Sequence, residues 1–164
     1  EKWSFFLYYF HLSLVAANET EPFRYRIHED EIRVYEAIHG GSTILRPDDT
    51  FGFSHIPYKK DFNDFLPGAL AEIKRVQEEK GLNPGVSGSD VIHFSAIPWL
   101  AFTSITHARN SAFPDSIPKI SFGKMTKSES GKLELPLSIR VHHALMDGIH
   151  VSRFVNRFQE LLDG

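Results

Sequence analysis

The first part of the chain combines one strongly apolar helical pattern with short extended stretches. Apolar residues recur at steps of three and four over residues 4–18, which predicts a largely buried helix that Pro22 closes. Residues 23–27 and 32–35 instead alternate apolar and charged side chains with a period of two, which predicts two strands. We therefore expect a hairpin whose turn is residues 28–31.

The middle of the chain combines short extended pieces with an amphipathic helix. Residues 42–45 and 51–55 carry extended patterns. From Asp61, a good N-cap residue, apolar positions recur at helical spacing, with a kink expected at Pro67. The Gly, Ser and Pro content of residues 81–90 predicts a loop that ends this helix.

The last part of the chain is dominated by strand patterns before a final amphipathic helix. The predicted strands are residues 92–94, 99–106, 119–125 and 133–142, and the predicted helix is residues 150–162. Strands interspersed with three helices predict an α/β sandwich, because the strand count is too high for a helical bundle. A length of 164 residues fits a single domain with one core.

Composition excludes several classes of protein. Apolar residues make up 41% and charged residues 24%, which is typical of a folded globular domain. The net charge of −3 argues against a nucleic-acid partner, which basic side chains bind. The absence of cysteine excludes disulfides, thiolate metal sites and a cysteine nucleophile, and fits a reducing cytoplasm. The apolar run at residues 4–17 is shorter than the roughly 20 residues of a membrane span, so we expect no membrane association.

The most informative segment is residues 141–148, with the sequence VHHALMDG, between a predicted strand and the final helix. Histidine is the side chain best able to accept a proton near neutral pH, and a hydroxyl nucleophile needs this before it can attack a thioester. His143 can act as this base when its tautomer is fixed, and Asp147 can order the turn at Gly148. Spacing alone leaves a second interpretation open, in which a strand-end histidine pair precedes an aspartate that caps the last helix.

Segments around this motif and upstream of it extend the pattern. They are residues 135–138 (LPLS), 149–154 (IHVSRF), 95–104 (SAIPWLAFTS), 61–65 and 23–27. In their order along the chain, these segments resemble the chloramphenicol acetyltransferase family over nearly the whole chain from Ser4 onward. The resemblance implies a two-layer α/β (α+β) sandwich with a mixed sheet and helices on one face, the CoA-dependent acyltransferase fold.

The resemblance also implies roles for individual residues. The second histidine of the pair, His143, is then the general base, and Asp147 is similar to the family aspartate that holds the site together through an arginine. Ser95 matches a serine whose hydroxyl donates to the oxyanion of the tetrahedral intermediate. Ser121 stands where the family usually has a threonine that assists the oxyanion through water. A hydroxyl bonded to strand backbone is the alternative role for Ser95.

Two further residues fall near the acyl donor in this comparison. Trp99 matches a family tryptophan near the donor channel, although a large aromatic residue in a strand is equally expected in the core. His93 stands where family members have a polar residue near the acetyl site, or is an ordinary core histidine. The remaining histidines have no spacing typical of a metal site, so we predict no metal.

The implied activity is an O-acetyltransferase that moves an acetyl group from acetyl-CoA to a hydroxyl of chloramphenicol or a similar xenobiotic, as in antibiotic resistance. The resemblance implies direct attack without an acyl-enzyme, in a homotrimer with active sites between subunits. Two alternatives stay open, a dihydrolipoyl-type acyltransferase and a catalytically silent protein that binds or assembles through the same fold. Condensation domains share the HHxxxDG motif but need a far longer chain.

The amino-terminal residues depart from the family pattern. Residues 1–3 resemble the family's opening, which continues into a basic, aromatic stretch carrying the arginine partner of the aspartate. Residues 4–10 resemble a helix that lies several dozen residues later in family members. We therefore expect one domain over residues 1–164 that lacks a segment between residues 3 and 4, so that Trp3 and Ser4 are not bonded neighbours.

Overall fold

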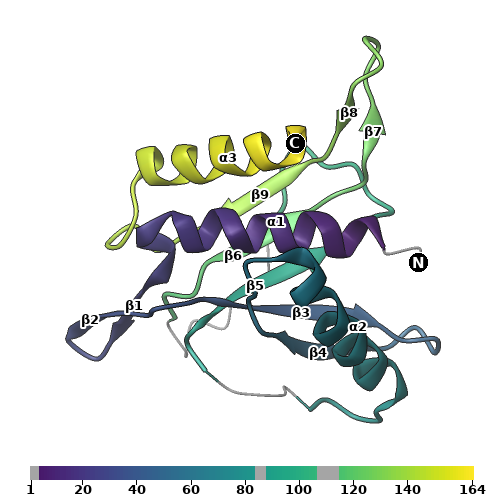
Figure 1. Cartoon of the computed structure of the whole chain (residues 1–164), viewed down its shortest axis with the longest axis horizontal. Helices are drawn as coiled ribbons and strands as arrows, with labels where there is room; N and C mark the ends of the chain where they lie inside the picture. Colours follow the sequence, from purple (N-terminus) through teal and green to yellow (C-terminus); the bar gives the residue numbers. More distant parts are fainter. Residues whose placement is uncertain (1–3, 84–87, 107–114) are drawn as a thin grey trace.

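The computed structural model of the chain describes residues 4–83, 88–106 and 115–164. The predicted break between residues 3 and 4 lies outside these described residues. The elements are α1 (Phe5–Glu19), the short 3-10 helix η1 (Glu21–Arg24), β1 (Tyr25–His28), β2 (Glu31–Val34), β3 (His39–Leu45), β4 (Phe51–Ile56), α2 (Phe62–Glu78), β5 (Val91–Ala96), β6 (Lys119–Phe122), β7 (Thr126–Lys127), β8 (Leu133–Glu134), β9 (Leu137–Arg140) and α3 (Gly148–Asp163) (Figure 1).

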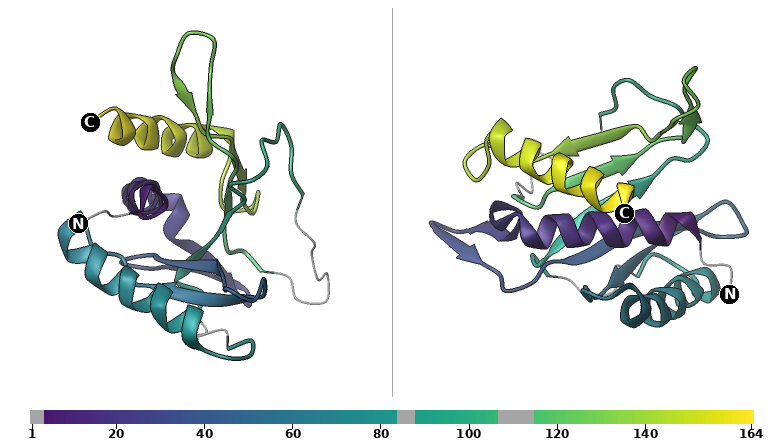
Figure 2. Two further views of the ribbon diagram at one scale, coloured as in Figure 1. Left: turned by 90° about the vertical axis from the view of Figure 1, so that its right-hand side faces the viewer. Right: turned by 45° about the horizontal axis from the view of Figure 1, so that its top comes forward.

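A five-stranded mixed sheet forms one layer of the molecule, in the order β4-β3-β5-β6-β9. The β3–β5 and β5–β6 pairs are parallel, whereas β4 and β9 pair antiparallel at the two edges. The three helices lie together on one face of this sheet (Figures 1 and 2). This arrangement confirms the predicted two-layer sandwich with a mixed sheet and helices on one face.

The core lies between the central strands and α1. Phe10 of α1 is fully buried and packs against Phe94 of β5 and Phe65 of α2, with ring centroids 4.5 and 6.2 Å apart. Burial of each such ring stabilises the fold by about 1.5–3 kcal/mol. Helices α2 and α3 flank α1, which explains why α1 is apolar almost all round. No helix within the described ranges has the length and apolarity to cross a bilayer.

Side chains alternate along each central strand, so that one face of the sheet lies against the core and the other is an outer face. Phe94 and Ile120 are buried beneath the helices, whereas their strand neighbours His93 and Ser95 point to the opposite side. None of the helices in the described residues covers the outer face of the sheet (Figure 2). The outer face is therefore where polar side chains of the sheet can meet a ligand.

The predicted helices agree with the structure to within a few residues. Ser4 caps α1, because its hydroxyl accepts a hydrogen bond from the backbone N–H of Phe6, and Asp61 caps α2 in the same way. Helix α2 continues through Pro67 and ends before Gly81, whose positive φ of 87° suits a residue without Cβ.

Several predicted strands were wrong in extent. The segment 99–106 contains no strand, because the chain leaves β5 at Ile97 and turns at Pro98. The predicted strand at 133–142 divides at Pro136 into β8 and β9, which belong to different sheets. The first predicted strand begins at Tyr25 rather than Phe23, because η1 occupies residues 21–24.

Candidate active site

His143 lies in the turn that joins β9 to α3. The carbonyl oxygen of His142 accepts hydrogen bonds from the backbone N–H groups of Leu145 (2.9 Å) and Met146 (3.2 Å). Both of these side chains are buried in the core, so they anchor the turn. The His143 side chain is 90% exposed in the isolated protomer. These contacts fix the backbone of the turn, while the imidazole of His143 remains accessible to solvent.

Asp147 faces this imidazole from the position directly before α3. Its Oδ1 lies 3.3 Å from Nδ1 of His143. Asp147 is also the N-cap residue of α3, where its backbone N–H donates to Nδ1 of His150 over 2.9 Å. Asp147 therefore agrees with both sequence interpretations, since it lies beside His143 and also caps the last helix. Because both side chains of the His143–Asp147 pair are exposed, the pair adds only about 0–1 kcal/mol to stability, and its main effect is orientation.

The contact determines which nitrogen of His143 is available. A carboxylate beside Nδ1 favours the tautomer with its proton on Nδ1, which leaves Nε2 as the acceptor. No arginine among the described residues forms an ion pair with Asp147. The aspartate therefore contacts the histidine directly in this structure, rather than through the arginine that the family resemblance implies.

A row of serines crosses the outer face of the sheet. The strand register places Ser95 of β5 opposite Ser121 of β6, and Ser121 opposite Ser138 of β9. Ser121 is 2% exposed, and Ser95 is half-buried. Within the described part of the chain, the Ser95 hydroxyl has no hydrogen-bond partner, so the predicted alternative of a bond to strand backbone is not observed. Ser95 and Ser121 are thus brought together, as the site assignment requires.

A second row, of basic residues, runs beside the serines. His93 pairs with Lys119, and Lys119 pairs with Arg140, each two residues from the serine of the same strand. His93 is exposed on the outer face, so it is not a core histidine. Its pKa is lowered nevertheless, first because neighbouring atoms remove water from the ring and second because Lys119 is cationic.

Trp99 lies in the loop that follows β5, at the carboxyl end of the parallel strands. It is 61% exposed, which excludes the core alternative. Leu100 fixes this loop to the end of β6, because its carbonyl oxygen accepts the backbone N–H of Lys124 over 2.7 Å. A Cβ at Gly123 would lie only 3.0 Å from that same oxygen, so the close approach of loop and strand requires glycine there.

The structure does not bring His143 and Ser95 together within this single chain. Strand β9 runs from Ser138, in the serine row, to Arg140 and then away to His143. Strands lie about 4.8 Å apart, so Ser95 of β5 is about 10 Å across the sheet from β9, and His143 lies in the turn beyond the end of β9. The chain therefore carries the residues of the predicted site in two separate places.

Several residues near the site were not found from the sequence. His150 completes the cap of α3, and its position three residues after Asp147 was the signal. Lys119 and Arg140 share the outer face with the serines, which the two-residue period could have indicated. Within the described ranges, no group of three or more potential ligand side chains could hold a metal ion.

Comparisons with known proteins agree with this geometry. Residues 1–159 match the family described as chloramphenicol acetyltransferase. The chain is 34% identical over 148 residues to chloramphenicol acetyltransferase 3 of Escherichia coli, covering 89% of this chain and 69% of that protein. It is 33% identical over 156 residues to the chloramphenicol acetyltransferase of Clostridium perfringens, covering 91% and 73%.

Solved structures show the same fold. A chloramphenicol acetyltransferase matches with a TM-score of 0.86 and 32% identity, over 97% of this chain and 78% of that one. The dihydrolipoamide acetyltransferase of Azotobacter vinelandii matches with a TM-score of 0.69 and 18% identity, over 95% and 68%, which shows a shared fold only. The chain therefore belongs to the chloramphenicol acetyltransferase family, whose members are acyltransferase enzymes.

Proposed function

We propose that this protein is an O-acetyltransferase that transfers the acetyl group of acetyl-CoA to a hydroxyl of a small molecule, such as chloramphenicol or a similar xenobiotic. The observation that carries the proposal is the His143 imidazole, held at Nδ1 by Asp147 while the ring remains exposed at the protomer surface. A cytoplasmic site of action fits a chain without cysteine.

In the proposed reaction, Nε2 of His143 accepts the proton of the acceptor hydroxyl as its oxygen attacks the thioester carbonyl. The carbonyl oxygen becomes an oxyanion in a tetrahedral intermediate. When the carbonyl re-forms, the carbon–sulfur bond breaks, and the CoA thiolate takes the proton from His143. The acetyl group moves once, directly to the acceptor, so the base returns to its neutral form without an acyl-enzyme.

Ser95 is proposed to stabilise the oxyanion. Its hydroxyl is half-buried, has no partner among the described residues, and lies on the outer face beside Ser121. A donor aimed at developing negative charge stabilises the transition state by about 2.7–4 kcal/mol. Ser121 assists through a bound water, His93 borders the acetyl group, and Trp99 borders the acyl-donor channel.

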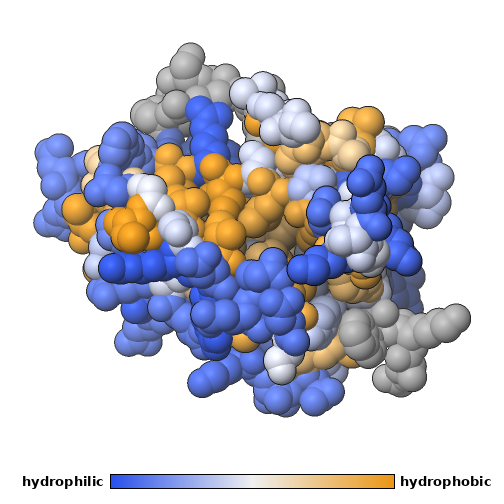
Figure 3. All heavy atoms as spheres, turned by 90° about the horizontal axis from the view of Figure 1, so that it is seen from above, coloured by the Kyte–Doolittle hydropathy of each residue, from blue (hydrophilic) through white to orange (hydrophobic). Residues whose placement is uncertain are grey.

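We propose that the two halves of the site meet between protomers of a homotrimer. His143 of one protomer then faces the serine row of its neighbour, because the two lie apart in a single chain. Figure 3 looks down on the side that carries α3 and shows a continuous apolar area between polar rims. Ile149 and Val155 of α3 are 55% and 37% exposed, which suits a surface covered by a second copy.

A complementation experiment tests both the activity and the division of the site. His143→Ala is expected to lower activity by about 10²–10⁴-fold, and Ser95→Ala by about 10²–10³-fold. Unfolding and refolding the two together forms mixed trimers, in which some sites combine an intact histidine with an intact serine. Thiol release from acetyl-CoA, with chloramphenicol as acceptor, should then recover to roughly a quarter of the native rate, since random pairing makes one interface in four intact.

Two results would count against the proposal. Refolded mixtures that stay as inactive as the separate variants would place both residues in one protomer's site. Native protein that releases no thiol with any hydroxyl acceptor would favour a silent binding protein, and release only with dihydrolipoamide would favour the dihydrolipoyl-type alternative.

We further propose that the complete protein contains a segment, absent from this sequence, between Trp3 and Ser4. The chain spans 69% of the Escherichia coli relative's length, which leaves room for such a segment. It would supply part of the acceptor pocket and the arginine partner of Asp147. Sequencing the coding region across these two codons tests this directly, and an uninterrupted junction would contradict it.

A further inference from the structure

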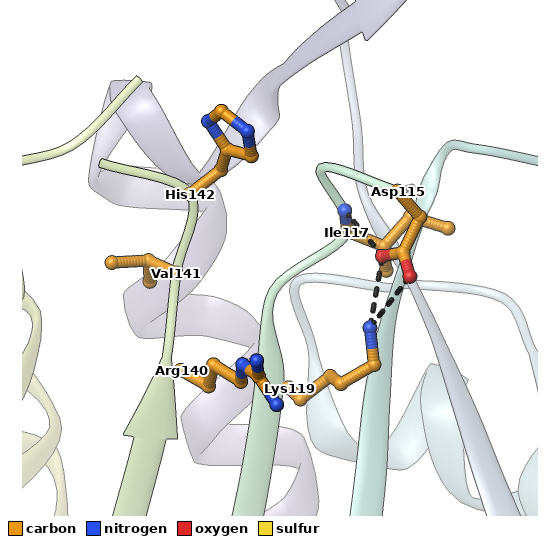
Figure 4. A pocket seen from close by; sticks show the side chains of 6 residues that line it. All are labelled: Asp115, Ile117, Lys119, Arg140, Val141 and His142. Atoms are coloured by element: carbon orange, nitrogen blue, oxygen red, sulfur yellow. Dashed lines mark hydrogen bonds and ion pairs between the residues drawn. The ribbon is translucent and has the colours of Figure 1, made fainter. Parts of the chain in front are cut away.

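A small pocket opens beside the candidate base, at the edge of the sheet where β6 begins and β9 ends. Its volume is about 50 Å³, and its lining residues are Asp115, Ile117, Lys119, Arg140, Val141 and His142. Figure 4 shows the side chains of Lys119 and Arg140 side by side across the two strands. The lining is therefore rich in charge, unlike the wholly apolar core on the other side of the same strands.

One cation of the pocket is neutralised within it. The Lys119 ammonium contacts both carboxylate oxygens of Asp115, at 2.8 and 2.9 Å, and the backbone N–H of Ile117 donates to the same carboxylate. Loss of hydration acts to raise the pKa of Asp115, but Lys119 and this N–H together lower it below its usual value. Asp115 is therefore an anion near neutral pH, and its charge is balanced by Lys119.

The second cation of the pocket is unbalanced. The guanidinium of Arg140 is exposed and has no hydrogen bond or ion pair with any residue that the structure describes. With Lys119 and Asp115 cancelling, the pocket carries a net charge of about +1. A planar guanidinium with five donors is the side chain best suited to bind a carboxylate or phosphate.

His142 adds a further donor. Its Nδ1 accepts a hydrogen bond from the backbone N–H of Ala144 over 3.3 Å. A neutral ring that accepts at Nδ1 carries its proton on Nε2, so the ring offers an N–H to the pocket that it lines. Two donor groups, one of them cationic, thus line a site whose only carboxylate is already neutralised.

The position of the pocket indicates which substrate reaches it. It lies beside the amino end of β6, whereas Trp99 follows the carboxyl end of the parallel strand β5. The serine row lies between these two ends. If Trp99 borders the acyl donor, as proposed above, the pocket lies on the far side of the reacting centre, where the acceptor must sit.

We propose that the pocket formed by Arg140 and His142 binds an anionic group of the acceptor, so that a hydroxylated acid binds more tightly than a neutral alcohol of the same shape. This inference rests on the proposed function, because it assigns the acceptor side of the same site. A carboxylate on the guanidinium leaves the acceptor's hydroxyl free to reach the reacting centre beside the serine row.

A matched pair of probes tests the inference by binding alone. The compounds 4-(hydroxymethyl)benzoate and 4-(hydroxymethyl)benzamide have the same shape and the same primary alcohol, and differ in charge. Calorimetry on the native protein should show the benzoate binding at least about tenfold more tightly, as expected for a hydrogen bond to a charged group. Arg140→Gln should abolish this preference, while Lys132→Gln, which removes the same charge from the distant β7–β8 hairpin, should preserve it.

Turnover measurements separate this inference from the proposed function. His143→Ala should keep the binding preference while losing thiol release, so absence of turnover alone leaves the pocket assignment intact. Equal binding of the two compounds by the native protein would overturn the inference. It would also be overturned if Arg140→Gln raised the KM for acetyl-CoA and left the acceptor preference unchanged, since the pocket would then hold a phosphate of the donor.

Discussion

At the scale of single residues, the site depends on how a few polar groups are held at the surface. The exposed His143 ring gains little from its pairing with Asp147 in stability, yet the contact selects the tautomer that a base requires. Asp147 has a second task as the N-cap of α3. These two tasks can be separated, because asparagine caps helices about as well as aspartate does.

The variant Asp147→Asn should therefore lose activity without losing stability. An amide no longer favours the proton on Nδ1 of His143, and kcat is expected to fall by about 10- to 10⁴-fold, the range for removing a carboxylate that orients a functional histidine. The midpoint of urea unfolding should change little. Native kcat in this variant would show that the carboxylate has only a structural role.

The sequence predicted these residues unevenly. The HHALMDG motif and the family resemblance located His143 and Asp147, because both lie within one short segment. Arg140 and Lys119 were not found, because the two-residue period can place each on the outer face but cannot show that the strand register makes them neighbours. The proposed meeting of His143 with Ser95 across protomers is likewise a property of assembly and remains a prediction.

At the scale of elements, α1 shows how tightly the helix layer meets the sheet. Gly40 of β3 lies beneath this helix, and a Cβ built there would clash with Cζ of Phe10. Phe10 is fully buried and contacts other rings on two sides, so it has little room to move. The apolar pattern of residues 4–18 predicted the helix, but this close contact depends on the packed tertiary structure.

Substitution of two glycines tests this packing. Gly40→Ala should destabilise the fold by about 1–3 kcal/mol through overpacking against Phe10. Gly68→Ala is the control, because no atom lies within 4 Å of a Cβ at that position in α2. It should stabilise the helix by roughly 0.5–1 kcal/mol. Urea unfolding of both variants measures the difference, and equal midpoints would show that α1 shifts easily.

Strand patterns were less reliable than helix patterns in this chain. The apolar run at 99–106 resembled a strand, but the Pro98 turn and the bond from Lys124 to Leu100 hold the start of this segment as a loop over the end of β6. Short apolar runs do not distinguish a strand from an anchored loop. The exposed Trp99 belongs to this loop for the same reason.

At the scale of the whole molecule, the fold lowers the pKa of several histidines. Burial lowers the pKa of His11, and the backbone carbonyl of Lys59 offsets this only in part. Burial also lowers the pKa of His39, despite the nearby Asp90 carboxylate. Nδ1 of His39 accepts the backbone N–H of Tyr58, a bond that a protonated ring cannot make.

Stability should consequently decline in mild acid. A histidine with a lowered pKa in the folded state is protonated first in the unfolded chain, so its contribution is complete above the unfolded value of about 6.5 and is lost as the pH falls below it. The urea midpoint should drop between pH 7.5 and pH 5.5. His39→Asn should show a smaller drop, and identical midpoints at both pH values in the native protein would refute the expectation.

The alternation of side chains along β5, β6 and β9 has a consequence for divergence within the family. Phe94, Ile120 and Ile139 maintain the interior, while residues one position away on the same strands lie on the outer face, where we propose that the ligand binds. During evolution, the residues that determine substrate specificity can therefore change without disturbing the interior that keeps the chain folded. Substitutions that change specificity should therefore cost little stability, which makes this surface a practical starting point for laboratory evolution.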